Sequence, residues 1–214
     1  MIAAAPAPLI CLDPGHGTPP AIGQQVEPIG PGSRVMKIKD GGGASGEAAV
    51  ALAIAKRARA VLLARGYRVA MTRTGPTIHL PWGDGNIARA RFCNRRHAAL
   101  MVRIHADGSS DRSLRGISTL VPAWHPGWTD DIYGRSLRAG RAVQRAVLAA
   151  TGASDRGIVR RADLTGFNWA NVPAVLVETG FLTNAKDSQL LHTPSYQQRL
   201  AQGLANGVAA FVRP

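Results

Sequence analysis

The sequence predicts a single α/β domain, built as a three-layer sandwich around a mostly parallel, mixed sheet of about six strands with helices on both faces. Short apolar runs alternate with longer alanine-rich or amphipathic segments along the 214 residues, an order typical of α/β folds. The run "VPAVLVE" (172–178) has the continuous apolar character of a strand buried on both faces. No internal repeat or linker divides the chain, so we treat residues 1–214 as one domain, in which 1–8 form a flexible leader.

The individual elements follow from local composition. Strands are expected over 9–13, 67–73, 100–105, 116–123, a weak segment near 156–160, and 172–178. Helices are expected over 46–66, about 86–98, 132–150 and about 195–212. The first helix is rich in Ala, Leu and Arg, and Gly66 ends it. Residues 14–46 are so rich in Gly and Pro that we expect mostly loop, and long loops in compact domains are usually functional or mobile.

The charge balance indicates an anionic partner. The chain carries 26 Lys and Arg against 13 Asp and Glu, which gives a formal net charge of +13. Such a surface attracts anionic polymers. The arginines are spread over separate elements rather than gathered in one basic arm, so specific nucleic-acid binding is not favoured and an anionic cell envelope explains the charge equally well. No apolar run approaches the roughly 20 residues of a membrane span, and no signal peptide is visible.

The two cysteines fall in different predicted elements. Cys11 lies on the first strand and Cys93 in the helix of about 86–98. Two cysteines are too few for a disulfide scaffold or a thiolate metal site. We expect two buried thiols rather than one bridge.

Two histidines and two glutamates stand where elements begin or end. His16 follows the first strand, Glu47 lies in the first turn of the first helix, and His105 and Glu178 end later strands. Parallel strands share a carboxyl edge, so these groups are expected to converge. Two histidines and a carboxylate are a ligand set of catalytic zinc, and a second carboxylate can act as the base. Each residue alone has a plainer interpretation: His16 as a turn residue, and Glu47 as a complement of the helix dipole.

The order of motifs resembles a known family. The chain contains "LDPGHG", "GE" opening an Ala-rich helix, "VAMTR", "IHAD" and "VPAVLVETGFLTN". These blocks resemble the zinc-dependent N-acetylmuramoyl-L-alanine amidases of the type-3 class, which cleave peptidoglycan outside the cytoplasm. The resemblance implies one Zn²⁺ per chain and hydrolysis of the amide bond between the lactyl group of muramic acid and L-alanine. It implies these roles: His16, Glu47 and His105 as zinc ligands, and Glu178 as the catalytic general base and acid.

Some residues depart from the family pattern or leave alternatives open. The block "RIHAD" replaces the usual Ser-Ile-His-Ala-Asn, which makes Arg103 and Asp107 unusual. Arg103 shares a strand face with His105, which would place it near the site. It is alternatively a structural ion-pair partner, and we favour the ion pair. Asp13 either orients a ligand imidazole or stabilises the turn before Pro14. Trp169 either lines a substrate groove or packs at its rim, and we favour packing.

Two rival functions remain at this point. One is a basic binding module that holds an anionic polymer without chemistry, and the other is a zinc peptidase or amide hydrolase acting on a different bond. Some family members carry a helix after the third motif that plugs the site. Here only about 25 residues separate His105 from the helix expected at 132, so we expect no plug and no need for an activator.

Overall fold

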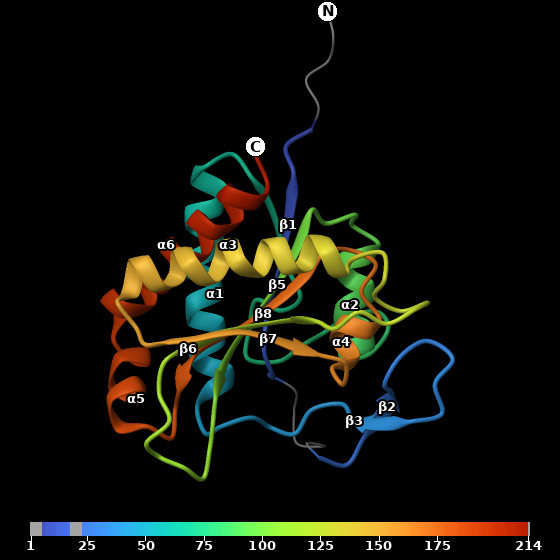
Figure 1. Ribbon diagram of the computed structural model, residues 1–214, viewed down its shortest axis with the longest axis horizontal. Coiled ribbons are helices and arrows are strands. Elements are labelled where there is room, and N and C mark those ends of the chain that lie inside the picture. Colours follow the sequence, from blue (N-terminus) through green and yellow to red (C-terminus); the bar gives the residue numbers. More distant parts are fainter. Residues whose placement is uncertain (1–5, 18–22, 214) are drawn as a thin grey trace, which may run out of the picture.

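A six-stranded sheet forms the centre of the molecule (Figure 1). The computed structural model describes residues 6–17 and 23–213. The sheet order is β4-β1-β5-β8-β6-β7. Its strands are β1 (Leu9–Pro14), β4 (Arg68–Met71), β5 (Leu100–Asp107), β6 (Ile117–Pro122), β7 (Asp155–Arg161) and β8 (Ala174–Phe181).

Helices cover both faces of this sheet. They are α1 (Glu47–Ala64), α2 (Asn86–Asn94), α3 (Tyr133–Thr151), α4 (Thr165–Asn168), α5 (Ala185–Leu191) and α6 (Pro194–Phe211). Apolar side chains of α1, α3 and α6 pack with one face of β1, β5 and β8 in the larger core, whereas α2 and α4 contribute to a second core on the other face. In Figure 1, α1 and α6 lie on the left and α2 and α4 on the right, while α3 runs across the view. The predicted three-layer α/β fold is therefore confirmed.

Strand direction decides where functional groups gather. The strands β4, β1, β5 and β8 run parallel to one another, while β6 is antiparallel to β8 and parallel to β7. The carboxyl ends of β1, β5 and β8 consequently lie at one edge, the usual place for sites in α/β sheets.

The segment expected to be mostly loop, 14–46, contains a small hairpin. Its strands are β2 (Val26–Pro28) and β3 (Met36–Ile38), which pair antiparallel outside the main sheet. The carboxylate of Glu27 anchors the hairpin, because it accepts hydrogen bonds from the backbone N–H groups of Asn86 and Ile87 at the start of α2. This anchor lies about 60 residues further along the chain, so the local sequence did not reveal it. The short helices α4 and α5 were also not predicted.

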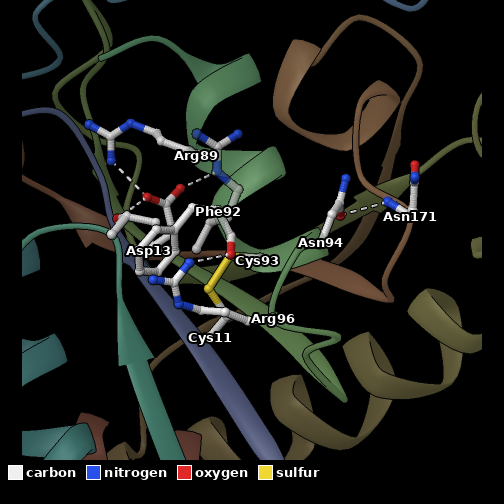
Figure 2. The surroundings of a disulfide bond; sticks show 10 residues. Cys11, Asp13, Arg89, Phe92, Cys93, Asn94, Arg96 and Asn171 are labelled. Carbon is white, nitrogen blue, oxygen red and sulfur yellow. Dashed lines mark hydrogen bonds and ion pairs between the residues drawn. A yellow bond between two sulfur atoms is a disulfide. The ribbon is translucent and has the colours of Figure 1, made fainter. Parts of the chain in front are cut away.

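The expectation of two free thiols is wrong. Cys11 and Cys93 form a disulfide with an S–S distance of 2.07 Å and a Cα–Cα distance of 5.7 Å. Figure 2 shows this bond joining β1 to α2, beside the ion pair of Asp13 and Arg89. The packing of α2 on the sheet brings the two Cα atoms within the range that a disulfide spans. A sequence separation of 82 residues gave no indication of this proximity.

The leader expected over 1–8 lies mostly outside the described residues. Across the part of the chain that the structure describes, no helix combines the length and apolar character needed to cross a membrane.

Candidate active site

The structure brings the four predicted site residues together at the carboxyl edge of the sheet. His16 follows β1, and Glu47 is the first residue of α1. His105 on β5 and Glu178 on β8 are register partners on neighbouring strands. Three strands and one helix start, separated by up to about 160 residues of chain, thus supply one cluster.

Glu47 lies between the two histidines. Its Oε1 atom is 3.0 Å from Nε2 of His16 and 2.9 Å from Nδ1 of His105. One potential ligand atom from each residue lies within 4.8 Å of the others, and the imidazole centroids are 5.0 Å apart. Two backbone amides, those of Ala44 and Ala106, also donate to the Glu47 carboxylate. The three side chains therefore face a common point and are held there by their surroundings.

Glycines make room for this cluster. A Cβ atom on Gly15 would collide with the ring of His105, and one on Gly43 would collide with Glu47 and His16. His16 itself has a positive φ of 55°, and Gly17 follows with φ 87°. Glycine tolerates such conformations and close approaches. The "GHG" turn is thus needed as much for the second histidine as for the first.

Asp40 is a site residue that the sequence analysis missed. Its Oδ1 atom accepts a hydrogen bond of 2.6 Å from Nδ1 of His16. This contact leaves Nε2 of His16 directed toward Glu47, and carboxylates commonly fix a ligand imidazole in this way. Asp40 lies in the Gly-rich segment 24 residues after His16, with no motif to mark it.

Of the two roles expected of Asp13, the structure supports stabilisation of the turn and not orientation of an imidazole, because its partner Arg89 also donates to the carbonyl of Pro14. It is fully buried and pairs with Arg89 at 2.7 Å and with Arg103 at 2.8 Å, while Thr72 also donates to it. Arg89 in turn donates to the backbone carbonyl of His16 at 2.5 Å. Asp13 therefore supports the histidine turn through Arg89 and does not orient an imidazole. The expectation that Arg103 is an ion-pair partner is confirmed.

The electrostatics of the cluster differ from one residue to the next. Burial by itself would raise the pKa of Glu47, but hydrogen bonds from His105 and His16 hold it well below its usual range. Burial lowers the pKa of His105, which favours the neutral imidazole. Hydrogen bonds to Asp40 and Glu47 outweigh the effect of burial on His16 and raise its pKa to about 9. An ionised carboxylate and neutral imidazoles are the forms that bind metals, so Glu47 and His105 already favour the binding forms, whereas His16 gives up a proton when a cation binds.

Glu178 has a different environment. Burial raises its pKa well above the ordinary value, and the charges of Asp107 and Glu47 add to this effect. Its Oε2 atom is buried without a hydrogen-bond partner among the described residues. A buried carboxyl group with a raised pKa and one free oxygen is suited to taking up and returning a proton.

The cluster opens into a cleft of about 530 Å³. Its walls include His16, Glu47, His105, Asp107, Leu176, Glu178, Arg161 and a polar rim formed by Ser45, Ser109, Ser110 and Thr183. Trp169 does not line this cleft; its indole N–H donates to the carbonyl of Pro28, and Arg91 lies over its ring. The expected packing role of Trp169 is confirmed.

Comparison with known proteins agrees with this geometry. The sequence profile described as N-acetylmuramoyl-L-alanine amidase matches residues 10–210. The chain belongs to this amidase family. It is 31% identical over 214 residues to an N-acetylmuramoyl-L-alanine amidase of Mycobacterium tuberculosis, covering 95% of this chain and 86% of that protein. It is 28% identical to the N-acetylmuramoyl-L-alanine amidase AmiA of Salmonella typhimurium, covering 95% of this chain and 75% of that protein.

A solved amidase has the same fold over nearly the whole chain. The crystal structure of the N-acetylmuramyl-L-alanine amidase Ami1 from Mycobacterium smegmatis superposes with a TM-score of 0.85 at 29% identity, covering 97% of this chain and 98% of that one. The family membership implied by the motifs is therefore confirmed.

Proposed function

We propose that this amidase hydrolyses the bond between the lactyl group of N-acetylmuramic acid and L-alanine in peptidoglycan, with one zinc ion held by His16, Glu47 and His105. The observation that carries the proposal is the convergence of three ligand atoms within 4.8 Å at the base of an open cleft. Two imidazoles and one carboxylate leave a position open for water, as catalytic zinc sites require.

The residues present fit a zinc ion. The ligand set has the nitrogen and oxygen donors that zinc accepts, and Asp40 supplies the outer contact to His16 that such sites commonly have. When bound, zinc acts as a Lewis acid that polarises a carbonyl group and lowers the pKa of water from 15.7 to about 7.

Glu178 is the general base and acid of this proposal. It lies on the strand next to His105 in direct register, so its carboxyl group is at the edge of the same cleft. Glu178 accepts a proton from the attacking water and gives it to the leaving amine of L-alanine, which completes the amide hydrolysis.

The surroundings support an accessible site outside the cytoplasm. All residues between β5 and α3 are described, and the only regular element among them is β6, so no helix of this segment plugs the cleft. We infer that purified protein acts on isolated peptidoglycan without an activator. The Cys11–Cys93 disulfide suits an oxidising compartment, and the net charge of +13 suits an anionic envelope.

Product analysis on purified peptidoglycan tests the bond that is cleaved. We expect free L-alanine amino termini on released peptides and intact muramic acid lactyl groups. Cleavage between two amino acids of the stem would instead identify a peptidase, and binding without cleavage would identify a binding module. Protein that cleaves only after a partner protein is added would contradict the activator-free proposal.

Elemental analysis and a variant pair test the residue roles. We expect His16→Ala and His105→Ala to lose zinc, so full zinc occupancy in either variant refutes the ligand set.

Glu178→Gln keeps the shape of the side chain and removes the base. We expect normal folding and zinc content with activity lowered by at least about 100-fold. The matched control is Asp107→Asn, which removes the neighbouring cleft carboxylate and should lower activity far less than Glu178→Gln does. Zinc loss in Glu178→Gln would make Glu178 a ligand, and nearly full activity would exclude it as the base.

A further inference from the structure

A second recess adjoins the catalytic cleft. It has a volume of about 550 Å³, and its walls include Arg112, Arg115, Lys186 and Thr183. Thr183 also lines the catalytic cleft, so the two hollows meet at this residue. A substrate that fills the cleft can therefore extend into the recess.

The recess carries uncompensated positive charge. No acidic residue lines it, and within the described residues no ion pair is formed by Arg112 or Lys186. Arg115 has a buried Nε atom without a hydrogen-bond partner, although it lies 3.7 Å from an oxygen of Asp187. The other oxygen of Asp187 is occupied by the backbone N–H groups of Gly116 and Phe181. Asp187 therefore pairs with Arg115 alone among the three cations of the recess.

The catalytic cleft has the opposite character. Three acidic residues line it: Glu47, Asp107 and Glu178. Its cation Arg161 is already paired with both oxygens of Asp163, at 2.7 and 2.8 Å. A substrate carboxylate that extends past the cleft is therefore attracted to the recess, whose lining contains cations and no acidic residue.

Hydrogen bonds hold the recess in place. The backbone N–H of Ser109 donates to the Thr183 hydroxyl at 3.0 Å, and the Asn184 side chain donates to the carbonyl of Arg112 at 2.8 Å. These contacts tie the segment that carries both arginines to the turn after β8. Thr183 comes five residues after Glu178, so the recess begins within roughly 16–18 Å of the proposed base. That is the reach of a few extended peptide residues.

We propose that the Arg112–Arg115 recess is a subsite for a carboxylate of the substrate's peptide stem. The inference rests on the proposed function, because it assigns a place to the part of the substrate beyond L-alanine. Peptide stems carry carboxylates on acidic residues and at the chain end, and arginine binds carboxylates through paired hydrogen bonds. The recess selects stems in which such a carboxylate is free rather than amidated.

Three muramyl tripeptides test the subsite. They differ only in charge: all carboxylates free, the second-residue carboxylate amidated, or the C-terminal carboxylate amidated. The enzyme variants are Arg112→Gln/Arg115→Gln and a matched control with the same charge change, Arg141→Gln/Arg145→Gln, on the exposed side of α3. Arg112→Gln alone, at an exposed position, serves as a second variant if the double variant melts early. The measured quantities are kcat and KM for cleavage of the muramyl–L-alanine bond.

We expect wild-type enzyme to lose about tenfold in kcat/KM, mainly through KM, when the recognised carboxylate is amidated. The Arg112→Gln/Arg115→Gln variant should lose a similar factor in kcat/KM on the tripeptide with all carboxylates free. Amidation of the recognised carboxylate should lower its kcat/KM no further. The amide that wild-type enzyme cleaves poorly identifies which carboxylate the recess binds. The subsite is refuted if the variant loses equally on all three substrates, changes less than about twofold on the free one, or matches the control. Wild-type enzyme that cleaves all three equally refutes the subsite alone, whereas failure to cleave any of them overturns the proposed function as well.

Discussion

Removal of the Cys11–Cys93 disulfide should lower the stability of the domain substantially. The bond joins β1 to α2 across a sequence separation of 82 residues. The chain-entropy relation for a loop of that length gives about 4.5 kcal/mol at 25 °C. Domains of this kind are typically stable by roughly 5–15 kcal/mol, so the loss is a large part of the total. Both cysteines are completely buried, and the helix they hold carries Arg89, which bonds the His16 carbonyl.

Denaturant unfolding measures this effect. Wild-type protein is unfolded with and without a reductant that does not bind zinc, and Cys11→Ala/Cys93→Ala is unfolded under the same two conditions. We expect reduction to lower the free energy of unfolding of the wild type by about 3–5 kcal/mol and to leave the variant unchanged. A shift below about 1 kcal/mol in fully reduced wild type would refute the reasoning, because the loop-closure contribution would then be absent. Thiol titration before each experiment establishes the redox state.

Further predictions concern the charges around the site. Burial raises the pKa of Asp13, but Arg89 and Arg103 outweigh this effect and hold it well below its usual range; its stabilisation is therefore present near neutral pH and is lost as the pH falls below about 4. Asp13→Asn should lower the free energy of unfolding near neutral pH by about 3–5 kcal/mol and make this free energy less dependent on acid pH. Denaturant titrations at two pH values measure both effects, and an unchanged acid dependence would contradict the prediction. Asp40→Asn should weaken zinc affinity by about 10–100-fold, because it removes the carboxylate that holds the imidazole of His16. Competition with a chelator measures the affinity, and an unchanged value would exclude this role of Asp40. Raising the salt concentration should weaken binding to peptidoglycan, because it screens the net charge of +13; sedimentation with isolated cell walls measures the bound fraction, and salt-independent binding would argue against an electrostatic contribution.

The sequence by itself determined the fold class and indicated four candidate site residues, which the structure brings together at one edge of the sheet. Hydrophobic runs of strand length, such as "VPAVLVE", report burial directly and are local features of the chain. The candidate residues follow or open regular elements, and parallel strands place such positions at a common edge, but their expected roles came from the resemblance to the amidase family. His105 and Glu178, for example, needed only the correct strand ends to be placed side by side.

Only the tertiary structure decided the contacts that depend on packing between distant segments. The Cys11–Cys93 bond, the Asp40 contact to His16 and the Glu27 anchor of the β2–β3 hairpin each join residues that are at least 24 positions apart. Neither local propensity nor hydrophobic periodicity contains information on such pairs. Their proximity follows from how α2 and the Gly-rich segment pack against the sheet, which is a property of the whole fold. The sequence therefore indicated the candidate groups of the site, and tertiary packing determined which residues hold them in place.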